Sequence, residues 1–278
     1  NVIDPANEAV GLANPLSADL AVMRTTLWSG LLKALVHNLN RQQHRVRLFE
    51  TGMRFIQMPN RPELSFESIQ QEKVVAGVVC GARREENWCE EKQAIDFYDV
   101  KGDLEAVLSL TGAVDEFSFA KGSHAALHPG QCAEILRNGE HVGYLGMIDP
   151  RVQQQLEIDS SVYVFELKLD QLEQRTLPAA SQMSRFPEVR RDISIVVDEA
   201  VSASEIKACV KSSADETLKN LKLFDVYRGK GIDPNRKSIG LGLTFQDVSR
   251  TLTDEETNAQ FDQIVSALRT ELDASLRD

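Results

Sequence analysis

Hydrophobic and polar positions follow two different periods in the first part of the chain. Apolar residues recur every three or four positions over residues 28–40 and 97–111, a spacing that places them on one side of a helix. Elsewhere the pattern is extended, and Asn138-Gly139 is a dipeptide that favours the positive φ angles of a tight hairpin turn. The segments predicted to be extended are residues 45–56, with a break at Gly52, 73–80, 133–136, 142–147 and 162–167. Together they predict an α+β domain with a mostly antiparallel sheet.

The remainder of the chain has a sharper strand pattern. Ile193, Ile195 and Val197 alternate with the residues between them, as in a strand with one buried face. Residues 238–245 alternate strictly between small or polar and large apolar side chains, and residues 218–227 are also extended. We therefore expect three strands here, each with one face toward a core.

Two capping boxes mark where helices begin between these strands. Ser202 with Glu205, and Thr253 with Glu256, are spaced so that each side chain of a pair can bond to the backbone N–H of the other. A last short strand fits near residues 275–277. The order βαββαβ predicts a ferredoxin-like domain, in which four antiparallel strands carry both helices on one face.

A small and polar run, residues 176–184, separates the two patterned regions. We place the domain boundary there, with a first domain over residues 1–183 and a second over residues 184–278. No repeat with a period of 20 to 50 residues is visible, which excludes solenoids and propellers.

Composition and charge narrow the function classes. The chain has 278 residues, 42% of them hydrophobic, and a net charge of −11, which argues against coating nucleic acid or an anionic membrane through bulk charge. No apolar stretch approaches the length of a membrane span, so we expect an unexported cytoplasmic protein. The four cysteines form no CxxC pair and are expected to be reduced and buried or idle.

The predicted second sheet leaves one face away from its helices. If Phe224 and Val226 pack under the helices, then Leu223, Asp225 and Tyr227 point to the open face. On the neighbouring strand the same alternation exposes Ser238, Gly240 and Gly242. Basic residues border this face: Arg228, Lys230, Arg236 and Lys237 in the connecting loop, and Arg185, Arg190 and Arg191 near the first strand.

An open sheet face with an aromatic ring and surrounding cations is a layout that holds single-stranded nucleic acid. A base would stack on Tyr227, and the Asp225 carboxylate could accept from the N–H groups of a guanine edge. Two other interpretations stay open: these residues are only a solvated sheet edge, or the ferredoxin-like sheet is a small-molecule-binding regulatory module.

Other candidate motifs are weaker. His124, His128 and Cys132 have the spacing of zinc ligands, but the intervening Pro129-Gly130 breaks any helix that could align them, so no metal site is predicted. Residues 231–238 lack the second glycine of a phosphate-binding loop. The basic run Arg41, His44, Arg45, Arg47 and Arg54 could meet phosphate or a partner protein, or could simply be solvated. No catalytic residues are predicted, and an independent enzyme remains the third alternative.

Several segments resemble one known family, in order and over nearly the whole chain. In the second domain they are residues 186–196, Leu223-Phe-Asp-Val-Tyr-Arg-Gly229, Lys237-Ser238, residues 250–252 and residues 274–277. In the first domain they are residues 23–32, 38–43, 48–52, 96–105 and 127–131. The chain is thereby identified as resembling the C-terminal part of bacterial phenylalanyl-tRNA synthetase β subunits: a catalytic-like domain followed by a ferredoxin-fold anticodon-binding domain.

The resemblance implies a fold and a function for each domain. The first would have the antiparallel fold of class II synthetases without its catalytic residues, and would pack with the catalytic α subunit in an α₂β₂ ligase that uses ATP and magnesium to attach phenylalanine to tRNA. The fragment alone would hold no cofactor. The second would bind the anticodon stem-loop, with Asp225 and Ser238 at the edge of the first anticodon base and Tyr227 stacked on it. Arg228, Lys230, Arg236 and Lys237 would be the candidates for phosphate contact.

Overall fold

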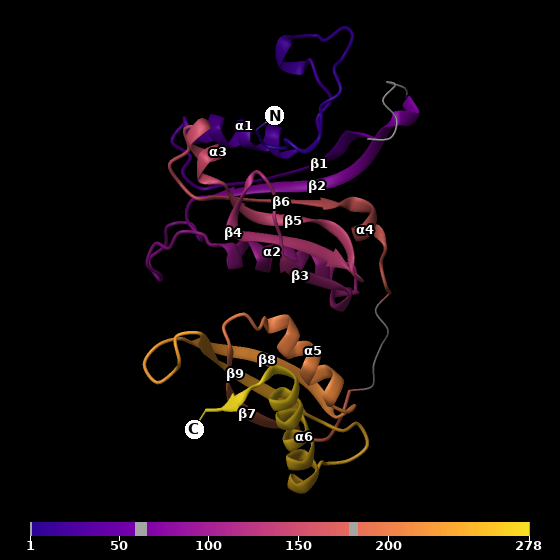
Figure 1. The fold of residues 1–278 in the computed structure, drawn as a ribbon, viewed down its shortest axis with the longest axis vertical. Coiled ribbons are helices and arrows are strands. Elements are labelled where there is room, and N and C mark those ends of the chain that lie inside the picture. Colours follow the sequence, from indigo (N-terminus) through magenta and orange to yellow (C-terminus); the bar gives the residue numbers. More distant parts are fainter. Residues whose placement is uncertain (1, 59–65, 178–182, 278) are drawn as a thin grey trace. The chain divides into compact units, whose positions relative to one another are not determined.

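The computed structural model describes residues 2–58, 66–177 and 183–277, and the chain divides into two compact units, residues 1–178 and 179–278. Each unit is a separate body with its own sheet (Figure 1). The polar run that separates the predicted domains lies partly outside the described residues, and the boundary at 183/184 stays a prediction.

The first unit is built on a six-stranded antiparallel sheet with the strand order β1-β2-β6-β5-β4-β3. Its strands are β1 (Val46–Gln57), β2 (Ile69–Cys80), β3 (Phe117–Lys121), β4 (Leu127–Arg137), β5 (Glu140–Ile148) and β6 (Val162–Lys168). Its helices are α1 (Trp28–Leu39), α2 (Phe97–Ser109), α3 (Pro150–Gln155) and α4 (Leu169–Glu173), with short 3₁₀ turns at Ala18–Leu20, Phe66–Ser68 and Val114–Glu116. The α+β prediction is confirmed.

Both faces of this sheet are covered because its central strands are apolar on both sides. Val74, Ala76 and Val78 belong to the core that includes α1, while Val79 belongs to a second core that includes α2. Successive residues of a strand point to opposite faces, so one run of β2 supplies both cores. The core toward α1 is closed by Leu31, Leu32 and Leu35, all buried.

Three local expectations for this unit have clear outcomes. The hairpin turn is confirmed, since Asn138 and Gly139 have φ angles of 52° and 85° between β4 and β5. Strand β3 had not been predicted, although Phe117 and Phe119 are apolar at alternate positions. The break at Gly52 was wrong: β1 runs through it, and the guanidinium of Arg24 lies over the glycine.

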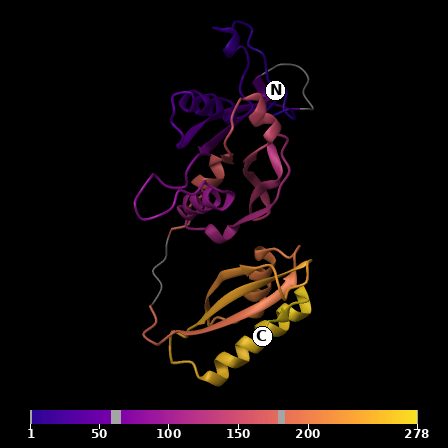
Figure 2. The same cartoon turned by 90° about the vertical axis from the view of Figure 1, so that its left-hand side faces the viewer.

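The second unit has the four-stranded antiparallel order β10-β7-β9-β8, which confirms the ferredoxin-like prediction. Its elements are β7 (Val189–Asp198), α5 (Ala203–Ser213), β8 (Leu218–Tyr227), β9 (Arg236–Phe245), α6 (Asp254–Leu272) and β10 (Ser275–Leu276). Ile206 of α5 and Ile264 of α6 are buried in one core with Ile195 and Leu241 of the sheet. Figure 2 shows α6, in yellow near the C-terminus, running along one face of this sheet.

Both predicted capping boxes are present, and the one at α6 makes its stability pH-dependent. Glu256 accepts from the backbone N–H of Thr253 and from both Nη atoms of Arg250, and the pKa of Glu256 is lowered to about 2, chiefly by the Arg250 hydrogen bonds. A carboxylate with a depressed folded-state pKa stabilises the fold above its unfolded value of about 4.3, and that contribution is lost as the pH falls through the folded value.

We therefore expect Glu256→Gln to weaken α6 at neutral pH, with the difference from wild type shrinking as the pH falls from about 4.3 toward 2. Hydrogen exchange of residues 254–272, compared between variant and wild type at each pH, measures this. The control is Glu255→Gln, the same change at the preceding exposed position. A Glu256→Gln difference that stays constant over this pH range contradicts the assignment.

Candidate nucleic-acid interface

The face of the second sheet away from α5 and α6 is called the open face. Ile193, Ile195 and Val197 of β7 point into the helix-side core, so Arg190, Asp192 and Ser194 lie on the open face by alternation. On β9, the residues of this face are Ser238, Gly240 and Gly242. On β8 the residues of this face include Lys222, Phe224, Asp225 and Tyr227, and Arg277, which follows β10, lies against Tyr227.

Strand β8 carries a β-bulge at the centre of this face. Leu223 pairs with Leu241 and Asp225 pairs with Gly240, so Phe224 is the extra residue of the bulge. A Cβ built on Gly240 would lie 2.8 Å from Cε2 of Phe224 and 3.1 Å from Cβ of Asp225. Both side chains of the bulged pair therefore lie over Gly240, and the absence of a side chain at this glycine is what leaves them room.

The bulge overturns part of the predicted residue assignment. Phe224 was expected under the helices, yet its side chain is on the open face and 47% exposed. Leu223 was expected on the open face, yet it packs against the helix-side core. Val226 pairs with Ile239, a helix-side residue, but is 49% exposed at the sheet edge, so it is not buried as predicted. The extra residue shifts the alternation by one position.

Tyr227 is held by the loop that follows it. It pairs with Ser238, its hydroxyl donates to the Lys230 carbonyl at 3.2 Å, and its ring lies against Gly229, where a Cβ would be 3.1 Å from the hydroxyl oxygen. Gly229 has a φ of 145°, a conformation that residues with a Cβ rarely adopt. The guanidinium of Arg277 lies 4.7 Å from the ring centroid, a cation–π contact.

Ser238 is placed opposite Tyr227 as predicted, but it is not exposed. Only 3% of the residue is accessible, and Gly240 and Gly242 are buried as well. The predicted exposure of the Ser238 hydroxyl is therefore wrong. A ligand group could reach the Ser238 hydroxyl only if neighbouring side chains moved.

The four predicted phosphate contacts have different surroundings. Arg228 pairs with Glu199, with 2.7 Å between Nη2 and Oε1, and this hydrogen bond lowers the pKa of Glu199. Lys237 donates to the Glu199 carbonyl at 2.8 Å. Arg236 donates from Nη2 to the carbonyls of Val196 and Asp273, at 3.0 and 2.6 Å. Lys230 is exposed on the loop.

Arg236 and Lys237 are thus engaged with backbone carbonyls, and their roles in phosphate contact stay predictions. Two other arginines lie over the aromatic rings themselves: Arg277 over Tyr227, and Arg190 over Phe224 with 5.7 Å from guanidinium carbon to ring centroid. Sequence reasoning placed Arg190 only at the rim and did not single out Arg277. The predicted last strand could have indicated Arg277, because it brings residue 277 beside β7. There the Arg277 N–H donates to the Ser194 carbonyl.

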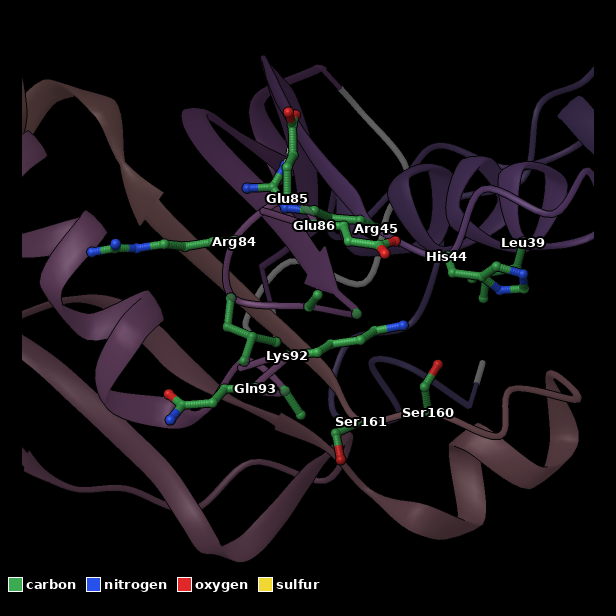
Figure 3. A pocket seen from close by; sticks show the side chains of 14 residues that line it. Leu39, His44, Arg45, Arg84, Glu85, Glu86, Lys92, Gln93, Ser160 and Ser161 are labelled. Atoms are coloured by element: carbon green, nitrogen blue, oxygen red, sulfur yellow. Dashed lines mark ion pairs between the residues drawn. The ribbon is translucent and has the colours of Figure 1, made fainter. Parts of the chain in front are cut away.

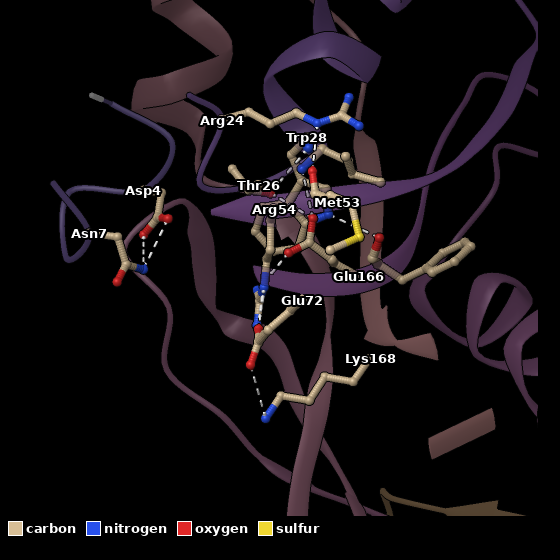
Figure 4. Close-up of polar contacts among 12 residues, drawn as sticks. Asp4, Asn7, Arg24, Thr26, Trp28, Met53, Arg54, Glu72, Glu166 and Lys168 are labelled. Carbon is tan, nitrogen blue, oxygen red and sulfur yellow. Dashed lines mark hydrogen bonds and ion pairs between the residues drawn. The ribbon is translucent and has the colours of Figure 1, made fainter. Parts of the chain in front are cut away.

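In the first unit the basic run was predicted to meet phosphate, a partner or solvent, and three of its arginines pair with acids. Arg54 is central: Nε and Nη2 contact Glu72, at 2.7 and 2.6 Å, and Nη1 donates to Glu166 at 2.8 Å (Figure 4). Glu166, which is 6% exposed, also accepts from the Thr26 hydroxyl and the Leu27 N–H, each at 2.8 Å. Arg47 pairs with Asp103, and Arg45 with Glu85.

A cleft of about 610 Å³ lies near the end of β2 (Figure 3). Basic and acidic side chains share its lining, with Arg45, Arg84 and Lys92 beside Glu85 and Glu86. Arg84 also pairs with Glu90, and Trp88 of the same acidic loop is 95% exposed. The mixed charges match the prediction of a solvated polar loop.

The predicted lack of a metal site concerns His124, His128 and Cys132. In the described ranges 2–58, 66–177 and 183–277, no group of three or more His, Cys, Asp or Glu side chains is arranged to hold a metal ion. Nδ1 of His124 accepts from the Ala126 N–H and Nδ1 of His128 from the Gly130 N–H, so each ring serves a local turn. None of the helices in these ranges is long and apolar enough to cross a membrane.

Comparison with known proteins gives the family. Residues 2–169 match the model of the phenylalanyl tRNA synthetase beta chain CLM domain, and residues 184–277 match that of the ferredoxin-fold anticodon binding domain. The chain therefore belongs to the phenylalanyl-tRNA synthetase β-chain family, which confirms the resemblance found in the sequence.

Individual relatives agree. The phenylalanine–tRNA ligase beta subunit of Pseudomonas fluorescens is 50% identical over 99% of this chain, and that of Dickeya dadantii is 47% identical over all of it. In both cases the chain spans 34% of the relative's length. Among solved structures, a pyrrolysyl-tRNA synthetase from Desulfitobacterium hafniense is similar to this chain with a TM-score of 0.42 and 13% sequence identity. The match covers 60% of this chain and 55% of the synthetase chain.

Proposed function

We propose that the second unit binds the anticodon loop of a phenylalanine tRNA on its open face. The observation that carries this proposal is the grouping of Tyr227, Asp225 and Ser238 on neighbouring positions of β8 and β9. A base stacks on the Tyr227 ring, and the Asp225 carboxylate accepts from the N–H groups of guanine, which other bases do not present in that arrangement. The base displaces the Arg277 guanidinium, which stays nearby as a cation for the adjoining phosphate.

The first unit packs with the catalytic α subunit of phenylalanine–tRNA ligase in an α₂β₂ assembly in the cytoplasm, and this chain contributes no catalytic group. ATP and magnesium belong to the reaction of the whole ligase, and the described residues of the first unit include no group of three or more His, Cys, Asp or Glu side chains that could hold the metal. Arg54, which lies over its sheet, has its guanidinium committed to Glu72 and Glu166 rather than free for phosphate. No step in this chain passes through ATP or magnesium. Retention of the α subunit on the immobilised chain tests the pairing.

Binding of the 278-residue chain to two tRNA transcripts tests the anticodon proposal. One carries the phenylalanine anticodon and the other has its first base, G, replaced. We expect a preference for G of about 5- to 150-fold, which corresponds to the roughly 1 to 3 kcal/mol that a good bidentate base contact supplies. Measurements at two salt concentrations separate base recognition from phosphate attraction, since only the latter weakens steeply with salt.

Asp225→Asn should remove most of this preference because an amide offers one acceptor where the carboxylate offers two. Asp233→Asn is the matched control, with the same charge change at an exposed position of the neighbouring loop. Equal binding of both transcripts by the wild-type chain at both salt concentrations, or no binding, would refute base recognition by the open face.

A further inference from the structure

Phe224 is an exposed aromatic ring that the proposed contacts do not use. The bulge in β8 turns it onto the open face, 47% exposed, beside Asp225 and above Gly240. An extra residue in a strand disrupts the regular ladder and re-aims a side chain, and such bulges are frequent next to functional sites. The helix-side core does not include this ring. Its position therefore needs an explanation other than core packing.

The surroundings of Phe224 repeat those of Tyr227. The Arg190 guanidinium lies 5.7 Å from the Phe224 ring centroid, as that of Arg277 lies 4.7 Å from the Tyr227 ring centroid. Arg190 is positioned by Asp192, which accepts from its Nε at 2.7 Å, and it crosses the backbone at Gly242, where a Cβ would be 2.9 Å from Nη2. Each ring thus carries one arginine, and glycines let the side chains lie close to the sheet.

We infer that Phe224 and Arg190 form a second stacking position for single-stranded RNA, which holds a loop base other than the one on Tyr227. This inference rests on the proposed binding of the anticodon loop. Phe224 and Tyr227 are three residues apart on β8, roughly 7 to 10 Å of extended chain including the bulge, so one base cannot stack on both. Every base has a π-face, so this position binds without selecting a base and sets the path of the strand across the sheet.

The open face carries Lys222, Arg190 and Arg277 against Asp192 and Asp225, and this excess of cations favours RNA as the occupant. Two guanidinium groups on one small face, Arg190 and Arg277, meet the phosphates on either side of a stacked base, and arginine adds a cation–π contribution to stacking. The competing explanation is structural: the ring only shields Gly240 from water. A leucine at position 224 distinguishes the two explanations. It would still cover Gly240, but it has no π-face on which a base could stack.

The test uses the 278-residue chain and an RNA hairpin with the anticodon loop of a phenylalanine tRNA, in which fluorescent aminopurine replaces one loop base at a time. We expect Phe224→Leu to weaken binding about 5- to 150-fold, the range found for removal of a stacked aromatic, and Phe224→Trp to retain it. Phe224→Leu should abolish the fluorescence change at one loop position, and Tyr227→Leu at a different one. Thermal unfolding of each variant shows whether the fold is kept.

A matched pair of charge variants tests the arginine. Arg190→Gln and the control Arg269→Gln each remove one exposed positive charge, the first from the open face and the second from α6 on the other side of the sheet, and only the first should alter the aminopurine signal at the Phe224 position. If Phe224→Leu binds as wild type while Tyr227→Leu does not, or if both affect the same loop position, the second stacking position is refuted and anticodon binding stands. If the wild-type chain binds no hairpin, both proposals fall.

Discussion

Replacing Arg54 by methionine should destabilise the first unit by about 3 to 5 kcal/mol, the cost of leaving a buried charge without its partner. The Arg54 side chain is 20% exposed and lies between Glu166, at 6%, and Glu72, at 14%. Methionine fills the volume but leaves two carboxylates facing each other. Both tryptophans, Trp28 and Trp88, belong to the first unit, and Trp28 is buried, so tryptophan fluorescence during urea unfolding reports on this unit alone.

The size of this effect should depend on pH. Burial raises the pKa of Glu166, and the charge of Arg54 is the strongest influence that lowers it. Without Arg54 the folded-state pKa rises further above the unfolded value of about 4.3. A group with a raised folded-state pKa destabilises the fold as the pH rises through that value, so the cost of Arg54→Met should be smaller near pH 4 than near pH 7.

Two controls separate the buried charge from other effects of losing an arginine. Arg54→Met combined with Glu166→Gln should regain a large part of the loss, because the amide oxygen can still accept from the Leu27 N–H. Arg24→Met removes an arginine whose ion pair with Glu50 is 43% and 38% exposed, and should cost within about 1 kcal/mol. Equal losses for Arg54→Met and Arg24→Met would contradict the proposed importance of burial.

Sequence periodicity predicted the second sheet well because β7 and β9 keep a strict alternation. Ile193, Ile195 and Val197 are buried as expected, and so are the apolar residues of β9. On β8 the same rule fails at one point, since the bulge changes which positions face the helices. After it, the odd-numbered Asp225 and Tyr227 face outward as predicted; before it, Lys222 pairs with Gly242 and faces outward instead of Leu223.

The fate of the cations could not be predicted in this way. Arg236 is captured by carbonyls of Val196 and Asp273, and Arg54 by acids on β2 and β6. These partners lie far away in the sequence, and backbone carbonyls leave no residue-type signal. A count of basic residues in a loop therefore indicates how much charge is present but not which side chains are free to meet phosphate. Of the two aromatic rings, alternation along β8 predicts the face of Tyr227 but not that of Phe224, which the bulge turns to the open face.

Tyr227→Ala should raise the dissociation constant for the anticodon hairpin about 5- to 150-fold, equivalent to roughly 1 to 3 kcal/mol for a stacked base. The reason is loss of the Tyr227 ring, which lies opposite Ser238. The hydrogen bond from the Tyr227 hydroxyl to the Lys230 carbonyl holds this ring in place. Tyr227→Phe keeps the ring and loses only that hydrogen bond, so it should bind nearly as wild type. Val226→Ala is the matched control, an exposed neighbour on the same strand that pairs on the helix side.

Stacking and edge recognition can be told apart with the same variant. A ring stacks on any base, so Tyr227→Ala should lower the affinity for the hairpin with G and for the one with a replaced base by similar factors. Asp225→Asn should instead bring the two affinities together, because the carboxylate contacts only the base edge. If Tyr227→Ala changed the ratio of the two affinities and not their level, Tyr227 would select the base, and the assignment of stacking to Tyr227 and selection to Asp225 would be wrong.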